Sequence, residues 1–181
     1  MKLLDFQNYI KGKFPTGFVE VVDPSNPFQC FDLVVAYCDW LKIPRVFPFT
    51  YAYQIYTNFG TAQAVYFDRI FNGPNDLVKE GDIVVWGYYY NFTAGHTAIA
   101  TGEGDLYNFK AYEQNDPENW LASKNSHIRN YAYTSSVLGW LRPKAFNIPL
   151  TDTQKIQKIK DTIETQISDT EFRNFTRDLI K

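Results

Sequence analysis

The apolar residues of this chain follow a helical spacing in one segment and an extended spacing in a later one. The helical spacing predicts an amphipathic helix over residues 30–41, and it is carried by Cys30, Leu33, Val34, Tyr37, Cys38 and Leu41. In the polar loop before this segment, Asn26 is suited to act as the N-cap, with Pro27 as the first helical residue. Cys30 is therefore expected in the first turns of a helix.

Residues 82–112 predict an antiparallel hairpin. Strands are expected over 82–86, 96–101 and 106–112, with a turn at residues 102–105 joining the last two. With this four-residue connection His96 lies opposite Ala111, and Glu113 becomes the diagonal neighbour of His96 on the same face. A three-residue connection would shift the register and turn Glu113 away.

The rest of the chain gives weaker signals for regular structure. A short helix is expected over residues 3–11, whereas residues 43–78 are aromatic and irregular, with most rings expected to fill the core. Asp82 is interpreted as a turn residue before its strand, and His127 as a loop residue.

Composition excludes several classes of protein. The chain has 181 residues with 45% hydrophobic residues, which is ample for one core. A net charge of -2 offers no basic field for nucleic acid. No stretch approaches the roughly 18 consecutive apolar residues of a membrane span, so no membrane insertion is expected. Asp5 interrupts the apolar N-terminus, which indicates synthesis in the cytoplasm without a signal peptide.

The two cysteines, Cys30 and Cys38, are not expected to form a disulfide. Eight helical steps separate them by roughly 12 Å of rise, whereas a disulfide needs Cα atoms within about 7 Å. The partial positive charge at a helix N-terminus favours the thiolate form of a cysteine placed there, as Cys30 is. Cys38 lies deeper on the apolar face and is expected to be a small buried hydrophobe. The cysteines and histidines show no zinc-binding spacing.

Cys30, His96 and then Glu113 or Asn115 supply a thiol, an imidazole and a carboxylate or amide. These three groups are what covalent acyl transfer requires, so a cysteine hydrolase is the leading hypothesis.

Five short motifs in this order resemble the CHAP family, the cysteine, histidine-dependent amidohydrolase/peptidase domains common in phage endolysins and bacterial wall hydrolases. Together they span residues 10–144, and they are Gln29-Cys30-Phe31-Asp32, Gly81-Asp82-Ile83-Val84-Val85-Trp86, Gly95-His96-Thr97-Ala98-Ile99, Glu113-Gln114-Asn115 and Gly139-Trp140-Leu141-Arg142-Pro143.

The resemblance implies a papain-like α+β fold over residues 1–147, with N-terminal helices packed on an antiparallel β-sheet. It also implies a phage endolysin that is made in the host cytoplasm and acts on peptidoglycan after release, as an N-acetylmuramoyl-L-alanine amidase or a stem-peptide or cross-bridge endopeptidase. Cys30 would attack the carbonyl, His96 would exchange the proton and Glu113 would orient His96. Asn115 would be a further polar member of the site, and Gln29 would join the Cys30 backbone N–H in binding the oxyanion.

No cofactor is expected. Some CHAP domains of phages bind calcium in the acidic loop around the nucleophile, and Asp23 and Asp32 stand at matching places. Calcium takes six or more oxygen ligands, so two carboxylates are weak candidates for a site. The helix dipole alone accounts for a carboxylate at Asp32.

Residues 148–181 form a predicted helical appendage or linker. Capping-box patterns begin at Thr151 and Ser168 and precede apolar residues at helical spacing. Two helices are too small for a core of their own, so they are expected to dock on the catalytic domain, self-associate or lead to a wall-binding module. Two further hypotheses stay open: a non-catalytic module that binds wall polymer or peptide in an aromatic groove, and an NlpC/P60-like cysteine peptidase.

Overall fold

A computed structural model describes residues 2–13, 29–74, 76–87, 93–115 and 126–144. The chain divides into two compact units, Met1–Phe146 and Asn147–Lys181, and all described residues belong to the first. The predicted C-terminal helices lie outside the described residues, as do Asp23, Asn26 and Pro27.

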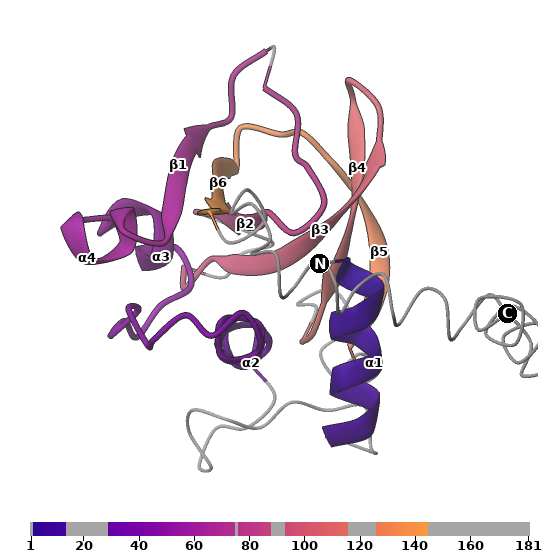
Figure 1. Ribbon diagram of the computed structural model, residues 1–181. Helices are drawn as coiled ribbons and strands as arrows, with labels where there is room; N and C mark the ends of the chain where they lie inside the picture. The colour runs from indigo at the N-terminus through magenta and orange to yellow at the C-terminus, as the bar shows by residue number, and fades with distance from the viewer. Residues whose placement is uncertain (1, 14–28, 75, 88–92, 116–125, 145–181) are drawn as a thin grey trace, which may run out of the picture. The chain divides into compact units, whose positions relative to one another are not determined.

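The first unit is an α+β structure whose strands form one six-stranded antiparallel sheet (Figure 1). Its helices are α1 (Leu3–Lys13), α2 (Cys30–Trp40), α3 (Gln54–Thr57) and α4 (Thr61–Ala64). Its strands are β1 (Phe67–Phe71), β2 (Ile83–Trp86), β3 (His96–Gly104), β4 (Asn108–Glu113), β5 (His127–Ala132) and β6 (Val137–Pro143). The order across the sheet is β1-β6-β2-β3-β4-β5.

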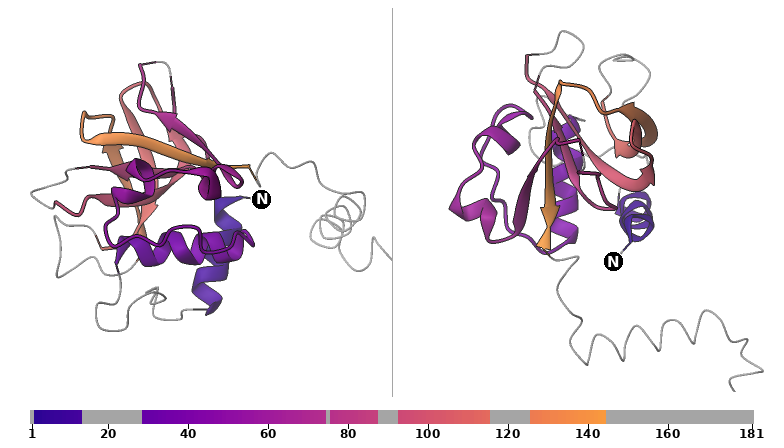
Figure 2. Two further views of the ribbon diagram at one scale, coloured as in Figure 1. Left: turned by 90° about the vertical axis from the view of Figure 1, so that its left-hand side faces the viewer. Right: turned by 90° about the horizontal axis from the view of Figure 1, so that it is seen from above.

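Helices α1 and α2 lie on one side of the sheet (Figure 2). The apolar residues predicted for α2 form its buried face, and Leu33, Val34 and Tyr37 are fully buried. Phe6 of α1 packs edge-on against Tyr37, with 4.9 Å between ring centroids. This core joins α1 and α2 to the sheet, because it also contains Ile83 and other strand residues. Each large apolar side chain buried in this way contributes about 1.5–3 kcal/mol.

Helix α2 begins at Cys30 with Gln29 as its N-cap, so the prediction of Asn26 as the cap and Pro27 as the first helical residue was wrong. The backbone N–H of Gln29 donates to Asp32 Oδ2 at 2.9 Å. This contact satisfies a backbone donor at the helix start and places a negative charge where the helix dipole favours it. Cys30 is consequently the first residue of the helix.

The opposite face of the sheet holds a second, aromatic core. Trp86 of β2 contacts Tyr131 of β5 with 4.8 Å between ring centroids, although β3 and β4 separate these strands in the sheet. Side chains on strands that are separated by two others can meet in this way only if the sheet curls around them.

The hairpin of β3 and β4 forms with a register different from the predicted one. Residues 105–107 connect the strands, and Ala111 pairs with Ala100 instead of His96. The register shifts between Ala100 and Gly104, so the shorter connection does not turn Glu113 away. The observed partner of Ala111 lies four residues from the predicted one, and a shift by an even number of residues keeps every side chain on its face of the sheet. Glu113 therefore still faces the same side as His96 and remains its diagonal neighbour.

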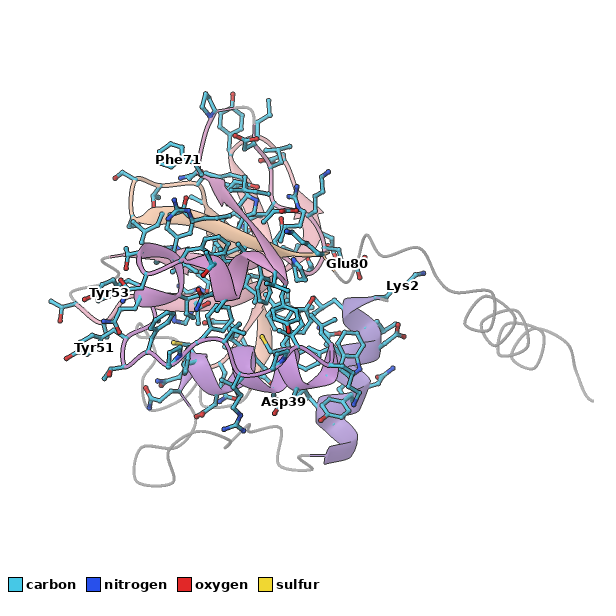
Figure 3. All side chains as sticks on the ribbon, turned by 60° about the vertical axis from the view of Figure 1, so that its left-hand side comes forward. Lys2, Asp39, Tyr51, Tyr53, Phe71 and Glu80 are labelled. Atoms are coloured by element: carbon cyan, nitrogen blue, oxygen red, sulfur yellow. The ribbon has the colours of Figure 1, made fainter. Side chains whose placement is uncertain are left out.

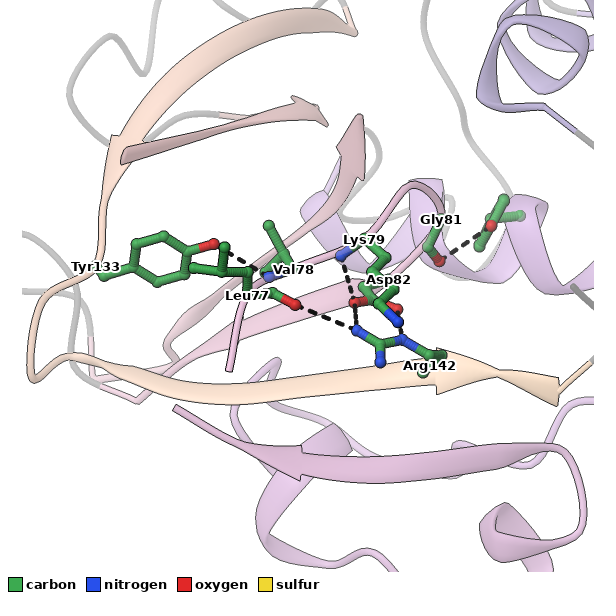
Figure 4. Close-up of polar contacts among 8 residues, drawn as sticks. Leu77, Val78, Lys79, Gly81, Asp82, Tyr133 and Arg142 are labelled. Carbon is green, nitrogen blue, oxygen red and sulfur yellow. Dashed lines mark hydrogen bonds and ion pairs between the residues drawn. The ribbon is translucent and has the colours of Figure 1, made fainter. Parts of the chain in front are cut away.

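A partly buried ion pair ties the start of β2 to β6 (Figure 4). Arg142 donates to both carboxylate oxygens of Asp82, at 2.9 Å from Nε and 2.7 Å from Nη2. Asp82 also accepts the backbone N–H of Lys79 at 2.7 Å, which confirms its predicted role in the turn. Burial raises the pKa of Asp82, and the hydrogen bonds from Arg142 and Lys79 oppose that rise.

Among the described helices none is long and apolar enough to cross a membrane.

Candidate active site

Cys30 and His96 meet at the ends of two elements that the sequence places far apart. Cys30 opens α2 and His96 opens β3, and the thiol and the imidazole are joined by a hydrogen bond. Both residues are buried, at 9% and 1% exposure. A thiol in contact with an imidazole can transfer its proton to the ring, which produces the thiolate that acts as a nucleophile.

Glu113, the last residue of β4, holds the other side of the His96 ring. Its Oε2 lies 2.8 Å from His96 Nε2, and its side chain is fully buried. Since Nε2 faces this carboxylate, Nδ1 is the ring nitrogen available to the thiol. The three groups therefore form a continuous chain of thiol, imidazole and carboxylate.

The electrostatics of the site favour a charged imidazole. Burial by itself lowers the pKa of His96, but the contacts with Cys30 and Glu113 outweigh it and raise this pKa to about 9. Burial likewise raises the pKa of Glu113, while the contacts with His127 and His96 bring it down to about 2. At neutral pH the site thus pairs a carboxylate with an imidazolium.

His127 also contacts Glu113, so the interpretation of His127 as an isolated loop residue was wrong. It is the first residue of β5 and pairs with Glu113 in the ladder between β4 and β5. Its Nε2 lies 3.1 Å from Glu113 Oε1. The sequence carried little signal for this strand, because Tyr131 is the one buried residue among the six of β5.

Two amides tie the end of β4 to the residue before Cys30. Gln114 Nε2 donates to the Gln29 carbonyl oxygen at 3.2 Å, and Asn115 Nδ2 donates to Gln29 Oε1 at 3.1 Å. Asn115 adopts a left-handed backbone with φ of 62°, a conformation that asparagine tolerates better than most residues. The structure therefore brings Gln29 and Asn115 together, next to Cys30 and Glu113 in the chain.

The turn before His96 requires a glycine. Gly95 has φ of +72°, and a Cβ atom there would lie 2.3 Å from the Trp86 carbonyl oxygen. The backbone N–H of Tyr53 donates to the Ala94 carbonyl oxygen at 3.2 Å, which braces the same turn. Tyr53 stacks on Tyr51 with 5.9 Å between ring centroids, and Figure 3 shows the two rings together at one side of the molecule.

Asp32 and Cys38, two further residues considered in the sequence analysis, make contacts that belong to the fold. Asp32 is buried and accepts the Gln29 N–H described above, and no cluster of three metal-ligating side chains occurs among the residues that the structure describes. Asp23 cannot be placed, since it lies outside them. Cys38 is buried and unpaired in the apolar core, and burial raises the pKa of its thiol, as expected for an inert cysteine.

With this geometry in place, comparison with known proteins points to phage endolysins. No family model matches the chain. The chain is 31% identical over 160 residues to endolysin PlyTW of Staphylococcus phage Twort, a match that covers 84% of this chain and 33% of that protein. It therefore spans about a third of the length of this curated relative.

Solved structures agree on the fold. The crystal structure of the wild-type endolysin LysIME-EF1 matches with a TM-score of 0.52 and 26% identity, over 79% of this chain and 64% of that one. The crystal structure of Ly7917 matches with a TM-score of 0.52 over 79% of this chain and 63% of the other. Its 16% identity to this chain supports a likeness of fold alone.

Proposed function

We propose that this chain contains the catalytic domain of a phage peptidoglycan hydrolase that cleaves an amide bond with Cys30 as the nucleophile. The main support is the hydrogen-bonded chain of Cys30, His96 and Glu113 at the ends of α2, β3 and β4. The likeness to endolysin PlyTW covers 84% of this chain, which supports peptidoglycan as the substrate. The helix-first, sheet-after arrangement also fits the papain-like CHAP fold that the sequence motifs resemble.

The reaction follows from the order of these groups. The Cys30 thiolate attacks the carbonyl carbon of the scissile amide, and the His96 imidazolium gives its proton to the nitrogen of the leaving amine. The resulting thioester is hydrolysed by a water molecule that His96 deprotonates, which restores the thiolate and the imidazolium. Glu113 keeps the ring oriented and stabilises its positive charge throughout.

The oxyanion of each tetrahedral intermediate needs hydrogen-bond donors beside the nucleophile. The Cys30 backbone N–H supplies one, because the first N–H groups of a helix have no partner within the helix. The Gln29 side chain is the second candidate. Its Oε1 is held by Asn115, so Asn115 sets the orientation of the amide whose Nε2 end is the donor.

The matched pair of cysteines in α2 offers a direct test. Cys30→Ala should abolish the turbidity loss of purified Gram-positive walls, by a factor of about 10³ or more. Cys38→Ala removes the other thiol of the same helix and should leave lysis within a few fold of the wild type. Circular dichroism should show both variants folded. Equal lysis by Cys30→Ala and the wild type would contradict the proposal of Cys30 as the nucleophile. Persistent wall binding without lysis across a wide panel would also contradict the proposal and would favour the non-catalytic binding module.

Mass spectrometry of the digested walls identifies the bond. Stem peptides released from muramic acid indicate an amidase, whereas a new N-terminal glycine or alanine within the peptides indicates an endopeptidase. The same products separate these activities from an NlpC/P60-like peptidase with the same residue order.

A further inference from the structure

Glu113 is held by two histidines that come from the strands on either side of it. His96 of β3 approaches Oε2 at 2.8 Å, and His127 of β5 approaches Oε1 at 3.1 Å. The side chains of Glu113 and His96 are almost fully buried, whereas that of His127 is 39% exposed. The carboxylate is therefore a bridge between a buried ring and one that reaches solvent.

The second contact matters because a carboxylate fixed at a single oxygen can still turn about its last side-chain torsion. Such a turn would move Oε2 away from His96 and leave the imidazolium without its partner. His127 fixes the other oxygen, and the ladder pairing of His127 with Glu113 sets the two side chains side by side.

We propose that His127 is a positioning residue, whose ring nitrogen holds Glu113 Oε1 so that Oε2 remains on His96. This inference deepens the proposed function and rests on it for its catalytic consequence. Edge strand β5 thereby contributes to the reaction without touching the substrate.

Two amide variants separate positioning from general stabilisation of the edge strand. The Nε2 atom of glutamine can reach the position of the histidine Nε2, whereas the side chain of asparagine is one carbon shorter. His127→Gln should therefore keep the contact with Glu113 Oε1, and His127→Asn should lose it. Ile128→Ala serves as the control for the strand, because Ile128 is the exposed neighbour that pairs with Tyr112.

The first measurement needs no substrate. A proton on His96 Nε2 that is shared with a buried carboxylate gives a protected, far-downfield signal in proton NMR spectra. This signal should persist in the wild type, His127→Gln and Ile128→Ala, and it should be lost or move upfield in His127→Asn. Its persistence unchanged in His127→Asn, or its loss in His127→Gln, would overturn the proposal.

The second measurement is turnover of soluble peptidoglycan fragments. His127→Asn should lower kcat by about tenfold to a hundredfold with KM within about twofold, because the reacting groups are misplaced while the substrate surface is intact. His127→Gln should restore kcat to within a few fold of the wild type. Equal kcat for the two amide variants would refute the catalytic consequence. If the wild type cleaves no peptidoglycan, the proposed function fails, and the NMR comparison still decides the positioning role.

Discussion

Replacing Glu113 by glutamine should destabilise the protein in a way that depends on pH. The pKa of Glu113 falls from an ordinary 4.5 to about 2 on folding. At ~1.4 kcal/mol for each unit this shift corresponds to about 3 kcal/mol. The pKa of His96 rises from 6.5 to about 9, which gives a figure of the same size. Cys30 is the first contributor to the rise in the pKa of His96 and His127 the first to the fall in that of Glu113, but both shifts include the contact between His96 and Glu113, so the two figures are not added.

The two shifts define the pH window. A lowered carboxyl pKa contributes stability that is complete above 4.5 and is lost as the pH falls toward 2. A raised histidine pKa contributes stability that is complete below 6.5 and is lost as the pH rises through 9. The wild type should therefore exceed Glu113→Gln by about 3 kcal/mol between these limits. The difference should shrink at high pH, where His96 is neutral and the Glu113 carboxylate no longer faces an imidazolium.

Urea denaturation at several pH values measures this difference, and the melting temperature at pH 6 should drop by about 10 °C. Glu103→Gln is the matched control, because Glu103 pairs with Lys110 at 2.7 Å while both side chains are about half exposed. That exposed pair should contribute less than about 1 kcal/mol. The reasoning would be refuted if the two variants lost equal stability at pH 6, or if the loss in Glu113→Gln were unchanged at pH 10.

Three further outcomes are expected. Arg142→Ala leaves the buried carboxylate of Asp82 without its cation and should lower the free energy of unfolding, measured by urea titration, by about 3–5 kcal/mol. Arg45→Ala is the control, because Arg45 forms a long, exposed ion pair of 3.8 Å with Asp39. It should change the free energy of unfolding by less than about 1 kcal/mol. Gly95→Ala should destabilise the protein and reduce wall lysis, whereas Gly12→Ala, in open space within α1, should stabilise it by about 0.5–1 kcal/mol in thermal melts. The rate of wall lysis should fall in acid and fall again above pH 9, where His96 loses its proton; a flat profile across this range would contradict its role as proton donor.

The three main residues of the candidate site, Cys30, His96 and Glu113, could be predicted from the sequence because each stands at the end of a helix or strand with a strong apolar pattern. The helical period fixed Cys30 near a helix start, and the extended period placed His96 at the start of a strand. The relation of Glu113 to His96 survived a wrong register, since an even shift keeps each side chain on its face of the sheet. The N-cap of α2 was predicted wrongly, because the polar loop before the helix contains several residues that are able to begin it.

Half of the sheet gave no usable pattern. Strand β1 lies at one edge and is mostly exposed, while β5 lies at the other edge and has one buried residue. Strand β6 is central and largely buried on both faces, so its apolar and polar residues do not alternate. The contact between His127 and Glu113 depends on the pairing of β4 with β5, which no short-range pattern could specify.

The place of β6 has a consequence for when this protein can become active during synthesis. It is the last described strand in the chain, yet it lies between β1 and β2 and pairs with both. A nascent chain that stops before Val137 carries β1 without a partner and β2 with one open edge. We therefore expect the domain to complete its fold only after Pro143 has left the ribosome, although Cys30, His96 and Glu113 are all translated earlier.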